Sequence, residues 1–204
     1  MSCVTLITSF LSLFFLFSFI QRNRRIGRET GAQIRSSNPL VIINIVLSTL
    51  IIVSTILATA YSGLYSYLGP LNCLHRNIIN DIGIGLYAIG VFGGLIAAQQ
   101  MQKSWRVGVN PGEKTELIRT GFFRYVRNPY FDSYLVMFIG LFLIRPSWIC
   151  LGLIVITMVT FHVMVLQEER YLLQHHGAEY QRYQEITGRY CPKIFHCSAA
   201  SKES

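Results

Sequence analysis

The chain has 204 residues, of which 51% are hydrophobic and 14% are charged, and its formal net charge is +8. A mean hydropathy of +0.41 and so few charges exclude an ordinary soluble domain, in which about a quarter of the residues are charged. The positive charge does not indicate a nucleic-acid partner, because the basic residues are gathered between apolar segments.

Five apolar segments follow one another along the chain: Thr5–Ile20, Leu40–Ala60, Ile78–Ala98, Phe131–Ile144 and Trp148–Leu166. A transmembrane helix needs about 20 such residues, so the fourth segment is short unless Tyr130 and Trp148 anchor it at the two interfaces. The first segment has neither a basic start nor a small-residue cleavage pattern, so we expect a retained helix rather than a signal peptide. The sequence predicts an all-α integral membrane bundle of about five transmembrane helices with a cytosolic helical tail at its C-terminus.

The basic residues alternate between the loops. The first and third loops hold Arg22, Arg24, Arg25, Arg28, Arg35, Lys103, Arg106, Lys114, Arg119, Arg124 and Arg127. The second and fourth loops hold only Arg76 and Arg145. Because loops rich in lysine and arginine stay in the cytoplasm, we expect a multi-pass protein with its N-terminus outside and its C-terminal tail in the cytoplasm.

Glycines are frequent in the third segment, which reads "IGIGLYAIGVFGG". Small residues at this spacing let neighbouring helices approach closely in lipid. We favour close helix packing, and the alternative is a wall that admits a lipid-like substrate.

The stretch "LQEERYLLQHHGAEYQRYQEITGRYCP" follows the last apolar segment. We expect Gly177 to break the helix and Pro192 to end its second piece. Its acidic and basic residues balance, which favours a tail folded back onto the preceding loop over one lying on the bilayer. The predicted organisation is residues 1–99 as the first three transmembrane helices, 100–192 as a region of motifs with the last two and the tail, and 193–204 as a flexible C-terminus.

A metal site is not expected in this tail. Cys191 and Cys197, with His196 between them, do not complete the four ligands of a structural zinc site.

The residues that carry chemistry gather at one membrane border. The loop from Trp105 to Phe131 is rich in arginine, aromatic rings and glycine, and Glu168 and Glu169 leave the last span on the same side. Aromatic faces suit a purine and also attract a cation, while carboxylates suit ribose hydroxyls or an ammonium group. S-adenosylmethionine would use both, although a nucleotide or a lipid headgroup would also fit.

The spacing of two motifs is more specific. "LIRTGFFRYVRNPYFDS" and "EERYLLQHHGAEYQRYQEITGRYCP" resemble the paired signature of the isoprenylcysteine carboxyl methyltransferase family, and "SWRVGVNPGEKTE" is similar to its bacterial members. The resemblance covers roughly residues 100–192. It implies an integral membrane methyltransferase that holds S-adenosylmethionine on the cytosolic side. Its acceptor would enter from the lipid bilayer and carry a group such as the carboxylate of an isoprenylcysteine.

The resemblance also implies particular site residues. The cofactor pocket would use Thr115, Glu116, Leu117, Ile118, Phe123, Asn128, Pro129, Tyr130, Phe131 and Glu168. The candidate catalytic residues are Arg127, Glu168 and Glu169. The two glutamates would position the cofactor, and the arginine would orient the loop or the acceptor.

The chain departs from the family pattern at several positions. Asn128 stands where histidine is typical, Phe123 and Phe131 replace tyrosines, and Ser133 replaces a glycine. Met164 stands where the family has a substrate-binding arginine, and a thioether cannot hold a carboxylate as a guanidinium does. We therefore favour an acceptor without a carboxylate.

Other functions remain as alternatives. An NADPH-dependent membrane ene reductase of the sterol-reductase kind could use Arg119 and Arg124 for the 2′-phosphate, although the acidic pair disfavours a polyanion. A phospholipid amine methyltransferase would share the cofactor site. A non-catalytic membrane protein such as a transporter subunit would be expected to have broken helices near the bilayer midplane.

Overall fold

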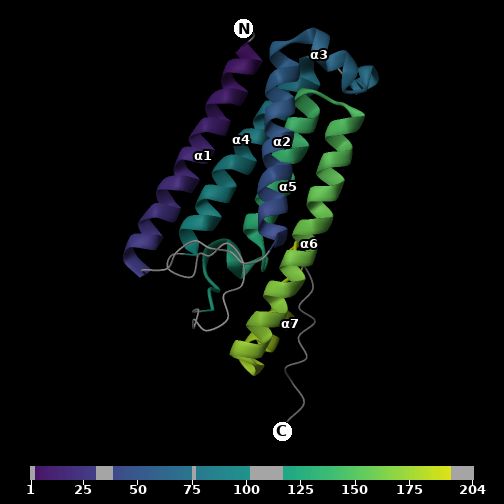
Figure 1. Cartoon of the computed structure of the whole chain (residues 1–204). Helices are drawn as coiled ribbons and strands as arrows, with labels where there is room; N and C mark the ends of the chain where they lie inside the picture. Colours follow the sequence, from purple (N-terminus) through teal and green to yellow (C-terminus); the bar gives the residue numbers. More distant parts are fainter. Residues whose placement is uncertain (1–2, 31–38, 75–76, 102–116, 194–204) are drawn as a thin grey trace.

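The computed structural model of the chain describes residues 3–30, 39–74, 77–101 and 117–193. Five helices run along one bundle (Figure 1): α1 (Cys3–Thr30), α2 (Pro39–Ala60), α4 (Asn77–Gln100), α5 (Pro129–Ile144) and α6 (Trp148–His176). In the described ranges, the shorter helices that connect or follow them are α3 (Ser62–Tyr67), η1 (Asn72–Leu74), η3 (Gly121–Arg124) and α7 (Ala178–Ile186). The predicted all-α membrane bundle is confirmed.

The predicted spans correspond to these five long helices. The helices α1, α2, α4 and α6 are long and apolar enough to cross a membrane. The fifth, α5, is shorter, with 16 residues. α6 continues well beyond Leu166, so the two glutamates that follow are helical. α3 lies at one end of the bundle and α7 at the other (Figure 1). Successive helices alternate in direction, which brings the end of α1 and the start of α5, both flanked by arginines, to the α7 end of the bundle.

The helices α4 and α5 pack closely against each other because glycines lie at their contact. A Cβ on Gly90 would lie 2.5 Å from the backbone nitrogen of Met137, and one on Gly83 would lie 2.8 Å from that of Ile144. Gly140 of α5 approaches the backbone of Tyr87 in the same way. Gly83 and Gly90 of the third span therefore serve helix packing, as favoured from the sequence, whereas a Cβ on Gly85 would meet nothing within 4 Å.

The core of the bundle lies along this pair. Val91, Phe138, Leu141 and Ile144 are completely buried there. Large apolar side chains on the outer faces are exposed instead, among them Phe10 of α1, Ile42 of α2 and Val155 of α6. A helix that is apolar on both its inner and outer faces suits a lipid environment.

Gly177 separates α6 from α7 with a φ of 50°, which confirms the predicted break. The predicted end of the second piece at Pro192 is wrong, because α7 already ends at Ile186. Thr187 has an extended backbone, and Gly188 pairs with Val126 in a parallel bridge. Contacts with the preceding loop thus end the helix before the proline can.

Candidate active site

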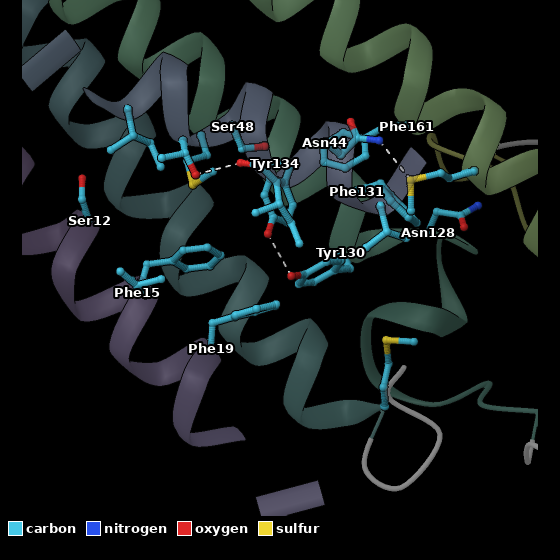
Figure 2. A pocket seen from close by; sticks show the side chains of 18 of the residues that line it. Ser12, Phe15, Phe19, Asn44, Ser48, Asn128, Tyr130, Phe131, Tyr134 and Phe161 are labelled. Atoms are coloured by element: carbon cyan, nitrogen blue, oxygen red, sulfur yellow. Dashed lines mark hydrogen bonds between the residues drawn. The ribbon is translucent and has the colours of Figure 1, made fainter. Parts of the chain in front are cut away.

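A cavity of about 500 Å³ lies between α1, α2, α5 and α6 (Figure 2). Its lining from α2 extends from Val41 to Ile56, which is about 22 Å along a helix that rises 1.5 Å per residue. The lining is mostly apolar. Its polar residues near the α7 end of the bundle are Arg127, Asn128, Gln167 and Glu168. The cavity thus joins a polar end to an apolar interior.

Six of the predicted site residues meet in this lining: Phe123, Arg127, Asn128, Tyr130, Phe131 and Glu168. They come from η3, from the start of α5 and from the end of α6. Pro129 is buried at the first position of α5, where its fixed φ suits the start of a helix.

Four other predicted residues, at the start of the first motif, have different outcomes. Leu117 and Ile118 are half-buried outside the cavity. Thr115 and Glu116 lie outside the described residues. Most of the predicted positions from residue 123 onward therefore converge, whereas Leu117 and Ile118 do not.

Glu168 is the carboxylate of the cavity. Within the described part of the chain it makes no hydrogen bond and no ion pair. A carboxylate held away from bulk water costs free energy unless a partner compensates it. Glu168 is therefore available to a ligand that carries a positive charge or donates hydrogen bonds.

Glu169 has a different position from the one expected of a catalytic residue. It is buried outside the cavity lining, and its Oε1 accepts a hydrogen bond from Nε of Arg127 at 3.1 Å. Arg189 donates two hydrogen bonds to Oε2 of the same carboxylate, from Nε at 3.1 Å and from Nη2 at 2.8 Å. These bonds raise the pKa of the Arg189 guanidinium. Glu169 thus holds two arginines in place and does not face the cavity.

Arg127 is bound both by these neighbours and by the tail. Beyond Glu169, its Nη1 donates to the carbonyl oxygens of Gln184 and Thr187, and its backbone N–H donates to the carbonyl of Gly188 at 2.8 Å. Its side chain is only 9% exposed. The guanidinium therefore positions the loop against the tail, which agrees with the loop-orienting role expected for it.

The tail folds back onto the aromatic loop, as the sequence predicts. The hydroxyl of Tyr183 donates to the carbonyl of Phe123 at 2.5 Å. Burial raises the pKa of Tyr183 to about 12, so the phenol stays protonated as a donor. The tail thereby fixes Phe123, one of the rings at the polar end of the cavity.

Aromatic rings surround the middle of the cavity. Phe131 and Phe161 make an edge contact with 5.3 Å between ring centroids, and Tyr134 packs on Phe161 at 5.1 Å. The hydroxyls of Tyr130 and Tyr134 lie 3.0 Å apart (Figure 2). This cluster offers ring faces and hydroxyls between the polar end and the apolar interior.

Met164, the position of the family arginine, also lines the cavity. Its sulfur accepts a hydrogen bond from Nδ2 of Asn44 at 3.0 Å, and Oδ1 of Asn44 accepts one from Thr160 at 2.7 Å. Asn44 is 3% exposed and links α2 to α6. The thioether therefore has a polar neighbour of its own but no charge.

Sequence reasoning missed the contribution of the first two helices. Ser12 of α1 and Asn44 and Ser48 of α2 line the cavity. Tyr134 of α5, which also lines it, was missed as well. One signal was available, because an amide such as Asn44 inside an apolar span is costly and usually faces the protein interior. The serines gave no such signal.

The bundle and its cavity define an integral membrane protein with a binding pocket between its helices. Residues 79–179, about half of the chain, match the family model described as phospholipid methyltransferase (PEMT). The chain belongs to this family of membrane methyltransferases, the group that includes the isoprenylcysteine carboxyl methyltransferase type. The match extends from α4 to the start of α7 and includes both glutamates. No curated protein matches the chain.

Proposed function

We propose that this methyltransferase transfers a methyl group from S-adenosylmethionine to a lipophilic acceptor that enters from the bilayer. The observation that carries the proposal is a cavity that joins motif residues to an apolar interior among the transmembrane helices. A cofactor at the polar end and a hydrocarbon chain in the apolar part would bring the two reactants together at the aromatic cluster.

The residues at the polar end fit this cofactor. The carboxylate of Glu168 lacks a partner within the described part of the chain and would receive the ammonium group or the ribose hydroxyls. The rings of Phe123 and Phe131 offer faces for adenine and for the sulfonium cation. Asn128, whose amide contacts Glu169 at 3.5 Å and the carbonyl of Arg189 at 3.3 Å, would hold the pocket wall in place.

The chemistry asks little of the protein beyond alignment. When bound, S-adenosylmethionine supplies a methyl carbon already activated by a positive sulfur. The protein has to hold the acceptor in line and keep water away, and such positioning lowers the barrier by several kcal/mol. The loop, tail and α6 do this through the Arg127–Glu169–Arg189 network, which fixes the start of α5 and therefore the rings of the cluster.

Two arginines that a reductase would need for NADPH do not line the cavity. Arg119 is paired with Glu179 of α7, and Arg124 is exposed on η3. Arg127, the cation of the described lining, is occupied by Glu169 and backbone carbonyls. This arrangement favours a methyl donor over a polyanionic nucleotide.

The acceptor is expected to lack a carboxylate. Met164 offers no charge, and the charge of Arg127 is compensated by Glu169. A carboxylate placed there would stay unpaired in a low-dielectric site, which is expensive. A phospholipid, as in the description of the family model, and other lipids with a neutral or cationic reactive group are the better candidates.

Ligand titration of purified protein in lipid nanodiscs tests the proposed function. S-adenosylmethionine should bind at micromolar to millimolar concentration, while NADPH should not, as measured by calorimetry. Incubation with S-adenosylmethionine that carries a labelled methyl group should then transfer label to the lipid extract. Binding of NADPH without binding of S-adenosylmethionine would overturn the proposal in favour of a reductase.

A further inference from the structure

The short helix η3 is attached to the end of α4. The backbone N–H of Phe122 donates to Oε1 of Gln100, the last residue of α4, at 2.8 Å. Gly121 packs on the same side chain with a φ of 63°, a left-handed conformation that favours glycine. Because α4 is long and apolar enough to cross a membrane, a segment attached to its last residue lies at the level of the lipid head groups.

The residues of η3, and Tyr125 directly after it, face two ways. Phe123 is buried and lines the cavity, and its carbonyl oxygen accepts a hydrogen bond from the hydroxyl of Tyr183. On the outer side, Phe122 is 40% exposed, Tyr125 is 60% exposed, and Arg124 between them is exposed as well. These three residues, the η3 surface, do not line the cavity. One turn of helix therefore connects the site to an outer surface of two rings and a cation.

The charge of Arg124 is not compensated by the neighbouring chain. The segment from Leu117 to Arg127 holds three arginines and no acidic residue. Arg119 pairs with Glu179, and Arg127 pairs with Glu169. Within the described part of the chain, Arg124 makes neither a hydrogen bond nor an ion pair. Its guanidinium is thus available to an anion from outside the protein.

The composition of the η3 surface indicates which anion this is. A guanidinium donates paired hydrogen bonds to a phosphate group. Aromatic rings at a membrane border lie among the head groups, whereas an exposed ring such as Phe122 in water leaves apolar area unburied. An anionic phospholipid matches both features, because it offers a negatively charged phosphate beside hydrocarbon. Leaflets that contain such lipids attract arginines near their surface.

We propose that the η3 surface binds the phosphate groups of anionic phospholipids, with Arg124 as the phosphate ligand and Phe122 and Tyr125 among the head groups. A lipid bound there holds η3 in place and with it Phe123, so that the charge of the leaflet regulates the affinity for the cofactor. This regulation rests on the proposed function, whereas the lipid contact does not.

Quenching of tryptophan fluorescence by brominated lipids tests the contact. Phe122→Trp is made in a full-length chain with Trp105→Phe and Trp148→Phe, so that the fluorescence reports on η3 alone. Tyr125→Trp in the same background is a second reporter. Brominated phosphatidylcholine and brominated phosphatidylglycerol should both quench, and phosphatidylglycerol should be preferred in mixed vesicles. An absence of quenching by either lipid at both positions would show that the η3 surface faces water and would overturn the proposal.

Charge variants test whether Arg124 causes the preference. Arg124→Gln should lower the preference for phosphatidylglycerol about fivefold, which corresponds to the roughly 1 kcal/mol that one arginine contributes near an anionic surface. Arg124→Lys should keep most of it. Arg182→Gln is the matched control, because Arg182 is exposed on α7 and lies in the sequence between Glu179 and Glu185. An equal loss in the control, or no loss in Arg124→Gln, would overturn the proposal.

Calorimetric titration tests the regulation of the cofactor site. S-adenosylmethionine should bind more tightly in nanodiscs that contain phosphatidylglycerol than in phosphatidylcholine alone. Arg124→Gln should reduce this difference, and Arg182→Gln should keep it. A lipid preference without any difference in cofactor affinity would overturn the regulation.

Two further outcomes separate the remaining explanations. If S-adenosylmethionine binds in neither lipid, the proposed function fails, while the quenching experiment still decides the lipid contact. If inorganic phosphate tightens cofactor binding in phosphatidylcholine nanodiscs as much as phosphatidylglycerol does, Arg124 binds a soluble anion and the lipid surface is overturned.

Discussion

Two neighbouring glutamates have different surroundings because successive residues of a helix point about 100° apart. Glu169 is directed at the loop and the tail, where Arg127 and Arg189 compensate its charge. Glu168 is directed at the cavity and has no partner within the described part of the chain. The first carboxylate therefore stabilises the structure, and the second is available for a ligand.

Glu168→Gln should weaken binding of S-adenosylmethionine about tenfold to a hundredfold. The substitution keeps the size of the side chain and removes its charge, and a hydrogen bond to a charged group contributes about 1.5–3 kcal/mol. Calorimetric titration of the nanodisc-embedded protein measures it. Glu185→Gln, on the exposed face of α7, removes the same charge outside the cavity and should bind normally. An unchanged affinity in the Glu168 variant would remove this residue from the site.

Met164→Arg should increase the rate at which the protein methylates acceptors that carry a carboxylate. We expect the unmutated protein to methylate a small prenylcysteine analogue poorly, because Met164 leaves the carboxylate unpaired. An arginine at this position restores a bidentate partner, so the initial rate with the analogue should rise. Met164→Leu changes shape without adding charge and should give no gain. Efficient methylation by the unmutated protein, with no benefit from arginine, would contradict the acceptor argument and leave the methyltransferase assignment intact.

At the scale of elements, the cavity depends on which helices pack tightly and which do not. α4 and α5 are in close contact through glycines, whereas α1 and α2 contact the rest of the bundle less closely and line the cavity. α4 contributes no residue to the lining in the described part of the chain. The α4–α5 pair thus acts as the rigid support from which the rings of α5 project.

Gly90→Ala should destabilise this support. The added Cβ would lie 2.5 Å from the backbone nitrogen of Met137, which cannot move aside as a side chain can. Overpacking of this kind typically costs about 1–3 kcal/mol. Thermal unfolding of the detergent-solubilised variant should show a lower Tm. Gly85→Ala is the control on the same helix, because its Cβ would meet nothing within 4 Å. Equal Tm values for the two variants would contradict the proposed packing.

At the scale of the whole molecule, the sequence was sufficient for the features that one helix or one loop determines. Hydropathy predicted the five spans, and Gly177 predicted the break before α7. Motif spacing predicted that residues such as Tyr130 and Glu168 converge. The end of α7 at Ile186 was not predictable from Pro192. It is accompanied by hydrogen bonds from Arg127, in a loop distant in sequence, to the carbonyls of Gln184 and Thr187.

Asn44 and Tyr134 required the three-dimensional structure. Whether Asn44 meets Met164 depends on the rotation of α2 about its axis and on its register against α6, and no local pattern fixes either. Likewise, the ring of Tyr134 packs against Phe15 of α1, which also lines the cavity, and this contact depends on how α1 lies against α5. Contacts between helices far apart in the sequence thus complete a site whose polar end was visible in the motifs.

The bundle places its arginine-flanked helix ends together with the polar end of the cavity, and we propose that this end faces the cytoplasm because arginine-rich loops are retained there. Two natural cysteines can report the orientation. Cys73 is exposed on η1, in the connection that follows α3, and Cys191 is exposed beside the docked tail near α7. α3 and α7 lie at opposite ends of the bundle (Figure 1).

Single-cysteine variants that keep either Cys73 or Cys191, with the other cysteines changed to serine, are expressed in cells and treated with a membrane-impermeant maleimide. We expect labelling of Cys73 in intact cells and labelling of Cys191 only after permeabilisation, because an S-adenosylmethionine pocket needs access to the cytosolic supply of that cofactor. The permeabilised sample shows that both thiols can react. Labelling of Cys191 but not Cys73 in intact cells would invert the orientation, and it would place the polar end of the cavity on the side where the proposed methyl donor is not made.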